Sequence, residues 1–173
     1  MVDAMQNLLN RRSIRKYTTQ QVPDALLDQV LEAGIYAPSG MNTQVAMAVA
    51  VRDKKTRDQL SRMNARVLGT ESDPFYGAPC VIVVLADPDR YKCWVEDGSL
   101  VMGNLMNAAH ALGLGSCWVN RARQMFDTEE GKALLREWGL PDNLRGIGNC
   151  ILGYPAEAPE ASPRAEGRIV KIG

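Results

Sequence analysis

Residues 100–119, LVMGNLMNAAHALGLGSCWV, decide how this chain folds. The part at 100–112 is apolar almost all the way round a helix, with small residues interspersed. A helix that is hydrophobic on every side must be buried on every side. Gly113-Leu114-Gly115 ends the helix, and residues 116–119 are expected to begin a strand. In a chain of 173 residues with few strands, we expect a second subunit to cover one side of this helix.

The run CVIVVLA at 80–86 has the continuous apolar character of a strand that is covered on both faces. Residues 155–167 are rich in Pro, Ala and Glu and are expected to have little regular structure, whereas 168–172 resembles a strand that could pair with another chain. We predict an α+β sandwich, helix-rich around a small sheet, as a single domain over residues 1–173. Helices are expected at 1–9, 23–35, 54–63, 94–112 and 129–138, and strands at 80–86, 116–119 and 148–153.

The composition excludes several classes of protein. Twenty basic and twenty acidic residues balance, which argues against a nucleic-acid binder that works by bulk charge. No apolar run reaches the roughly 18–20 residues of a membrane span, and the N-terminus lacks the pattern of a signal peptide. Four cysteines without a close pair fit neither a metal site nor a cluster, so we expect buried thiols in a cytoplasmic protein. They are Cys80, Cys93, Cys117 and Cys150.

A dense group of positive charge follows the first expected helix. Arg11, Arg12, Ser13 and Arg15 lie within five positions of a chain that carries no net charge. Guanidinium groups are planar, permanently charged donors that match phosphate oxygens. If the segment is extended, Arg11, Ser13 and Arg15 share one face, and a bend at the helix end could bring Arg12 in as well. The alternative is a solvated basic face.

A second unusual segment is turn-rich and ends in two amides. Pro38-Ser39-Gly40 predicts a turn, and Asn42 and Gln44 would project on one side if that stretch is extended. Side-chain amides can read both the donor and the acceptor edges of a ring. Phosphate donors in one segment and ring-reading amides in another indicate a nucleotide-like cofactor, although an ordinary surface turn is the alternative for this segment alone.

The other motifs in the sequence give little evidence of function. Gly113-Leu114-Gly115 follows a helix, and Trp118 stands where a dinucleotide fingerprint needs its third glycine. The chain contains no phosphate-binding GxxxxGK[ST] loop. His110 is the one histidine and is expected to be a core residue and not a base. Glu96 and Asp97 are interpreted as acidic residues that offset the helix dipole in its first turn.

Taken together, the motifs closely resemble the FMN-dependent nitroreductase family. The resemblance runs through the whole chain in order, and it is strong because the motifs occur together. They are RRSIRKY at 11–17, APSGMNTQ at 37–44, FYGAP at 75–79, the stretch from Trp94 to Trp118, ILGYP at 151–155, and Pro163-Arg164.

The resemblance implies a small, mostly antiparallel sheet surrounded by helices, in an obligate homodimer whose long central helices meet at the interface. It also implies two FMN sites, each built from both subunits. One subunit would supply the contacts to the phosphate, the ribityl chain and the pyrimidine edge of FMN. Its partner would supply the turn-rich segment to the same FMN, and the end of a strand would border the isoalloxazine. The implied contacts are Arg11, Arg12, Ser13, Arg15 and Arg164, then Pro38, Ser39, Gly40, Asn42 and Gln44 of the other subunit, then Trp118, Val119, Asn120 and Arg121.

The activity implied is an FMN-dependent oxidoreductase in which NAD(P)H reduces the flavin and a nitroaromatic, quinone or similar acceptor then binds, with no catalytic side chain required. The alternatives are a dehalogenase- or dehydrogenase-type flavoenzyme, a flavin-binding module without catalysis, or a basic-loop interaction protein. The chain departs from the family pattern at Ser162, where relatives often have a basic residue. It also lacks a lysine in 64–74, where Arg66 is the one basic residue, and its excursion over the flavin shortens to about residues 63–75.

Overall fold

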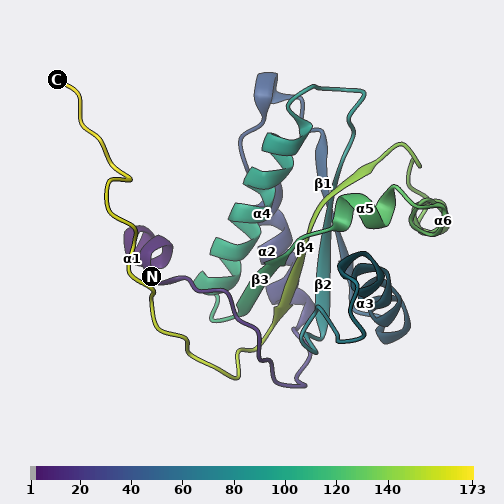
Figure 1. The fold of residues 1–173 in the computed structure, drawn as a ribbon, viewed down its shortest axis with the longest axis horizontal. Helices are drawn as coiled ribbons and strands as arrows, with labels where there is room; N and C mark the ends of the chain where they lie inside the picture. The colour runs from purple at the N-terminus through teal and green to yellow at the C-terminus, as the bar shows by residue number, and fades with distance from the viewer. Residues whose placement is uncertain (1–2) are drawn as a thin grey trace.

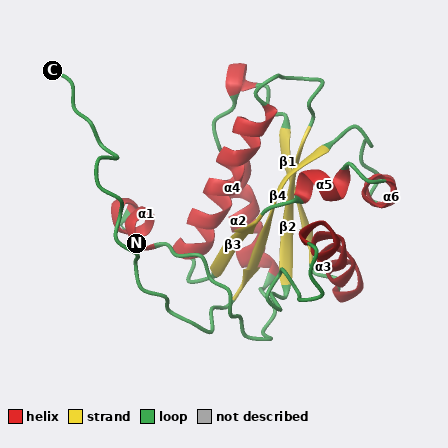
Figure 2. Ribbon diagram, viewed as in Figure 1, coloured by secondary structure: helices red, strands yellow, loops and turns green. Residues whose placement is uncertain are grey.

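The computed structural model describes residues 3–173, and an antiparallel sheet in the order β1-β2-β4-β3 forms its centre. Figures 1 and 2 show helices on both sides of this sheet. The strands are β1 (Ala46–Val51), β2 (Cys80–Ala86), β3 (Gly115–Val119) and β4 (Arg145–Gly153). The helices are α1 (Ala4–Asn10), α2 (Asp24–Ile35), α3 (Lys54–Leu68), α4 (Trp94–Ala111), α5 (Ala122–Phe126) and α6 (Glu129–Glu137), with a 3-10 turn η1 (Gly40–Asn42).

The two central strands, β2 and β4, have almost no exposed surface. Every residue of β2 is buried and apolar, so helices can cover the strand from both sides. The β2–β4 register shifts between Val84 and Leu85. Beside this irregularity Gly148 makes room for Trp118 of β3, because a Cβ at Gly148 would lie 2.4 Å from the indole nitrogen.

Two apolar layers enclose the sheet. Side chains such as Ile82 and Val84 pack under α2 and α4, whereas Val81 and Val83 pack under α3, α5 and α6. Figure 1 shows these two groups of helices on opposite sides of the strands. The predicted α+β class with a small antiparallel sheet among helices is confirmed.

α4 departs from the prediction that it is buried on every side. The face that carries Trp94, Val101 and Leu105 is buried against the sheet and α2. On its outer side Leu100 is 46% exposed, and nothing lies within 4 Å of a Cβ built on Gly103. In one chain, therefore, α4 keeps one side uncovered.

Most predicted elements lie close to their observed bounds, and β2 matches residue for residue. The prediction at residues 1–9 is confirmed from residue 4 onward, and residues 1–2 lie outside the described chain. Three features were not predicted: β1, the short helix α5, and the last turn and a half of α3, which continues to Leu68 and not to Met63.

The two terminal segments lie together beside the sheet. Ser13 forms a parallel bridge with Ser116 of β3, and Tyr17 an antiparallel bridge with Pro155. Beyond this point the tail passes α1 and runs away from the sheet (Figure 1). Residues 168–172 have no regular structure in the single chain, and their predicted pairing with another chain stays a prediction.

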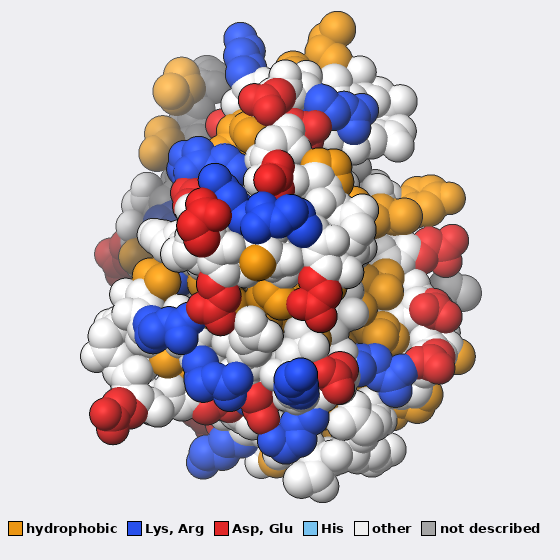
Figure 3. All heavy atoms as spheres, turned by 90° about the vertical axis from the view of Figure 1, so that its right-hand side faces the viewer, with side chains coloured by type: hydrophobic (Ala, Val, Ile, Leu, Met, Phe, Trp, Pro, Cys, Tyr) orange, Lys and Arg blue, Asp and Glu red, His pale blue; other side chains and the backbone are white. Residues whose placement is uncertain are grey.

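The outer surface on the side of α3 and α6 mixes both signs of charge. Figure 3 shows basic and acidic side chains alternating over this side with only small apolar areas between them. No helix among residues 3–173 is both long and apolar enough to cross a membrane.

Candidate functional site

The arginine segment leaves α1 and runs in extended form along the edge of the sheet, the conformation under which Arg11, Ser13 and Arg15 were expected to share a face. The Ile14 amide donates to the Ser116 carbonyl at 3.0 Å, which fixes the segment to β3. Arg11 is half-buried, and its Nη1 atom is buried without a hydrogen-bond partner in the described chain. A guanidinium N–H group without a partner is suited to donate a hydrogen bond to an anion.

Its two neighbours behave differently. Arg12 Nη1 donates to the carbonyl oxygens of Leu9 at 2.7 Å and Arg11 at 2.8 Å, so this guanidinium satisfies the C-terminal end of α1. Arg15 is exposed, and its backbone amide donates to the carboxylate of Glu157 at 2.5 Å. The Arg15 side chain therefore stays available, whereas that of Arg12 is already engaged.

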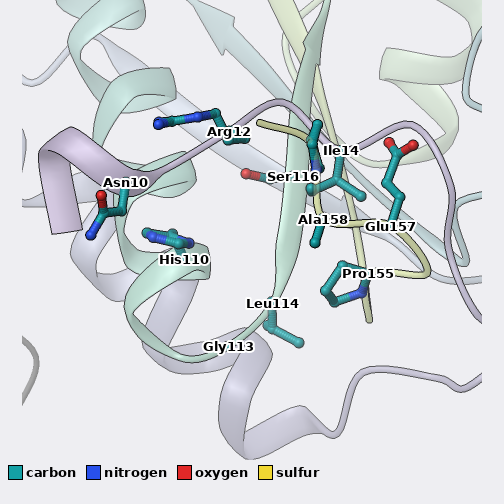
Figure 4. A pocket seen from close by; sticks show the side chains of 11 residues that line it. Asn10, Arg12, Ile14, His110, Gly113, Leu114, Ser116, Pro155, Glu157 and Ala158 are labelled. Carbon is teal, nitrogen blue, oxygen red and sulfur yellow. The ribbon is translucent and has the colours of Figure 1, made fainter. Parts of the chain in front are cut away.

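A cavity of about 310 Å³ lies between the end of α1, the end of α4 and the C-terminal tail. In Figure 4 the Ser116 hydroxyl turns toward the side of the cavity where His110 and Asn10 lie. Burial first, and then the charges of Arg11 and Arg12, lower the pKa of His110. The ring is therefore neutral at pH 7, and it lines a cavity, although a core position was expected.

The turn-rich segment forms a tight loop and not the extended stretch that was considered. Gly40–Asn42 is a 3-10 turn, and Met41, Asn42 and Gln44 all have positive φ, at 52°, 55° and 49°. Gln44 Nε2 donates to Asn42 Oδ1 at 3.0 Å, so the two amides lie together by a different geometry. The backbone amide of Gln44 also donates to the Ser39 hydroxyl at 3.1 Å.

Asp97 holds this loop, and the sequence interpretation missed that role. Its Oδ1 accepts a hydrogen bond from the Gly40 amide at 2.9 Å. Both residues named for the helix dipole are in the first turn of α4, but Asp97 is 4% exposed and Glu96 is exposed. A signal was present, because Asp97 stands three residues after Trp94 and four before Val101, on the buried face.

The end of β3 is fixed by two buried amides that the sequence did not single out. Asn64 Nδ2 donates to the Asn120 carbonyl at 2.8 Å, and Asn64 Oδ1 accepts from Arg121 Nε at 3.0 Å. Asn149 Nδ2 donates to the Val119 carbonyl at 3.3 Å. Arg121 has a φ of 77°, which is unusual for a residue with a side chain.

The loop after α3 is tied down and does not form a long excursion. Asp73 accepts hydrogen bonds from Arg57 and Ser61 of α3, both at 2.5 Å, and from the amides of Phe75 and Gly77. Phe75 is fully buried. The stretch predicted at 63–75 thus reduces to a short turn, because α3 occupies its first half.

The arginine segment and the Pro38–Gln44 loop are two groups of predicted residues that one chain does not bring together. Asn7 of α1 donates to the Asn107 carbonyl near the C-terminal end of α4, whereas Gly40 binds Asp97 near its N-terminal end. Ten residues of helix separate these points, about 15 Å at 1.5 Å per residue. Arg164 lies in the exposed tail and forms no ion pair within residues 3–173.

Three of the four cysteines are buried thiols, as predicted, and Cys93 is half-buried. Burial raises the pKa of Cys80 to about 12 and raises that of Cys150 further. The Cys80 and Cys150 thiols therefore stay protonated and are chemically quiet at neutral pH.

An antiparallel sheet between two helical layers, with an arginine segment along its edge strand, defines the class of fold. The model of the nitroreductase family matches residues 8–73 and 65–154, and the chain belongs to this family. The family predicted from the motifs is confirmed.

Relatives and solved structures match this chain over almost its whole length. A protein of Archaeoglobus fulgidus with the provisional name NADH dehydrogenase/NAD(P)H nitroreductase is 34% identical over 162 residues, covering 91% of this chain and 88% of its own. An NADH dehydrogenase of Thermus thermophilus is 30% identical over 201 residues, with coverage of 95% and 92%. The crystal structure of a nitroreductase with bound FMN from Bacteroides fragilis superposes with a TM-score of 0.89 at 29% identity and covers all of both chains.

Proposed function

We propose that this protein is an FMN-dependent oxidoreductase that takes electrons from NAD(P)H and delivers them to a small acceptor such as a nitroaromatic compound or a quinone. The similar Bacteroides fragilis protein binds FMN. NAD(P)H appears in the name of the Archaeoglobus fulgidus relative, and an FMN reductase of Bacillus subtilis that uses NAD(P)H is 26% identical over 186 residues.

The observation that carries the proposal is the free positive charge beside β3. Arg11 keeps a buried Nη1 without a partner, and neither Arg11 nor Arg15 forms an ion pair in the part of the chain that the structure describes. A phosphate supplies the acceptor oxygens that such guanidinium groups match. The residues present therefore fit the phosphate of FMN.

A second subunit completes the site in this proposal. The arginine segment and the Pro38–Gln44 loop lie at opposite ends of α4, so a copy of the chain whose α4 runs antiparallel would place one against the other. Apolar side chains are exposed at both ends and along the outer side of this helix, and a partner would bury them. They are Met5, Leu8 and Leu9 of α1, Leu100 of α4, Ile35 and Tyr36 just before the loop, and Met41 within it.

FMN, when bound, supplies the redox chemistry: it accepts hydride from NAD(P)H and passes electrons to the acceptor. The chain supplies binding and orientation. Arg11 and Ser13 would hold the phosphate and ribityl groups, Arg15 the pyrimidine edge, and Asn42 and Gln44 of the partner the ring. Trp118 to Arg121, held at their C-terminal end by Asn64 and Asn149, would border the isoalloxazine. His110 does not need to act as a base.

We also propose a reducing, cytoplasmic location. The proposal is supported by the four cysteines, all of which are free thiols in the structure. Reducing compartments keep thiols in this state.

A spectrum and a steady-state assay test the function. Purified protein loaded with FMN should retain the flavin through gel filtration and show its blue absorption. It should then oxidise NADH or NADPH faster when a quinone or a nitrofuran is added, and the FMN-free protein serves as the control. Protein that retains no FMN would contradict the proposal, and retained FMN without any NAD(P)H oxidation would indicate a flavin carrier.

A further inference from the structure

The first turn of α4 and the segment that leads into it together touch the Pro38–Gln44 loop at three places. Asp97 Oδ1 accepts from the Gly40 amide at 2.9 Å, and Arg90 Nη2 donates to the Thr43 carbonyl at 3.1 Å. The Tyr91 ring packs on Gly40 so closely that a Cβ there would lie 2.2 Å from Cε1. Two backbone hydrogen bonds and one packed ring therefore hold the loop against the start of α4 and the residues just before it.

The loop needs such support because its backbone is strained. Met41, Asn42 and Gln44 have positive φ although each carries a side chain. This conformation is uncommon, and it persists only where surrounding contacts determine it. The strained backbone sets the position of Asn42 and Gln44, whose side-chain amides are joined by a hydrogen bond from Gln44 Nε2 to Asn42 Oδ1 at 3.0 Å.

Among these supports, Asp97 is unusual in its burial and its incomplete bonding. The residue is 4% exposed, its Oδ1 binds Gly40, and its Oδ2 is buried without a partner in the described residues. A buried carboxylate with an unsatisfied oxygen costs folding free energy. The helix dipole favours an acid in the first turn, but it gives no reason for burying the acid with one oxygen unsatisfied, whereas a contact with the loop does.

We propose that Asp97 is a positioning residue of the FMN site. Its carboxylate fixes the Gly40 amide, and through the turn that follows it sets the direction in which Asn42 and Gln44 present their amides to the cofactor. This inference rests on the proposed function, since it needs the loop to contact FMN. Asp97 also lines a cavity of about 300 Å³ together with Pro38, Ser39 and Gln44, so it lies at the loop's inner side.

Three variants separate this role from a general effect on the helix. Asp97→Ala removes the acceptor of the Gly40 amide, Asp97→Asn keeps an oxygen at the same place, and Glu96→Ala removes the neighbouring exposed acid of the same turn. We expect the FMN dissociation constant, measured by quenching of FMN fluorescence, to rise at least tenfold in Asp97→Ala. It should stay within threefold of the wild type in Asp97→Asn and in Glu96→Ala.

The visible circular dichroism of the bound flavin gives a readout that a purely structural role would not move. We expect Asp97→Ala to change this signal and Asp97→Asn to restore it, whatever happens to the melting temperature of the FMN-free protein. If Asp97→Ala does not fold, Asp97→Leu, which has a similar size, takes its place with the same expectations.

Two outcomes overturn the proposal. One is a folded Asp97→Ala or Asp97→Leu variant with wild-type FMN affinity and dichroism. The other is a folded Asp97→Asn variant as impaired as Asp97→Ala. In both, the wild type binds FMN and the proposed function survives, whereas a wild type that binds no FMN overturns the function and this inference together.

Discussion

Replacing Arg11 by alanine should separate cofactor binding from chain stability. Arg11 Nη1 is buried and has no hydrogen-bond partner among residues 3–173. An unsatisfied buried donor costs free energy in the FMN-free protein. Arg11→Ala removes that cost together with the proposed phosphate contact, so we expect the melting temperature of the FMN-free protein to stay constant or rise while FMN binding weakens.

The size of the loss follows from the bond that is removed. A hydrogen bond to a charged group contributes about 1.5–3 kcal/mol, and about 1.4 kcal/mol corresponds to a tenfold change in affinity. The FMN dissociation constant of Arg11→Ala should therefore rise by roughly 10- to 150-fold. Titration of FMN-free protein followed by flavin fluorescence measures it, and thermal melts without FMN give the stability.

Arg12→Ala is the matched control. Its guanidinium donates to the carbonyls of Leu9 and Arg11 at the end of α1, so its loss should lower the stability of the FMN-free protein by about 1 kcal/mol. If Arg11→Ala instead destabilises the FMN-free chain as much as Arg12→Ala, or keeps full FMN affinity, then Arg11 is a structural residue and the phosphate assignment is wrong.

Arg15→Gln should lower the flavin's reduction potential by tens of millivolts, because a fixed positive charge at the pyrimidine edge favours the anionic reduced flavin, and about 30 mV corresponds to roughly 1.4 kcal/mol for two electrons. A redox titration indistinguishable from the wild type would remove Arg15 from the site. Asp73→Asn should reduce the free energy of unfolding by about 1–3 kcal/mol, because Arg57 Nη2 loses its charged partner while the guanidinium keeps its bonds to Asp58 and Ala78. Burial raises the pKa of Asp73, but bonds from Ser61, Arg57 and two amides outweigh it and lower that pKa. The stabilisation is therefore present above the unfolded carboxyl's pKa, about 3.9, and is lost as the pH falls through the lower folded value. Urea unfolding of both proteins at pH 7 and pH 3 should show the difference shrink, and an equal difference at both would contradict it.

The sequence predicts best those elements whose burial is complete. β2 matches residue for residue, because a run of β-branched residues has no other stable place than between two layers. β1 was missed because AMAVAV has alanine at every other position, and its strand state comes from pairing with β2. α3 continues through residues 64–68, NARVL, because Asn64 and Ala65 find buried positions, which no local pattern indicates.

For the candidate site, the sequence identifies the donor types better than their partners. The group of arginines stands out in the sequence and an extended segment was considered, but whether a guanidinium is free or engaged depends on which carbonyls α1 leaves at its end. That local geometry separates Arg11 from Arg12. The strained loop and its contact with Asp97 join residues 57 positions apart, and such long-range bonds leave no periodic signal in the chain.

The arginine segment and the Pro38–Gln44 loop lie at opposite ends of α4. If each FMN is held by both groups, one from each subunit, then cofactor binding is linked to dimer assembly. A ligand that binds only the dimer stabilises it by RT ln(1 + [L]/Kd), about 2.7 kcal/mol at a hundredfold excess over Kd. The melting temperature should therefore rise with both protein and FMN concentration. Leu100→Glu, which places a charge on the outer side of α4 at a position 46% exposed in one chain, should weaken the dimer and FMN binding together. Sedimentation velocity with detection at the flavin's absorption band decides, because a folded, FMN-loaded monomer at micromolar concentration would show that one chain holds the cofactor alone.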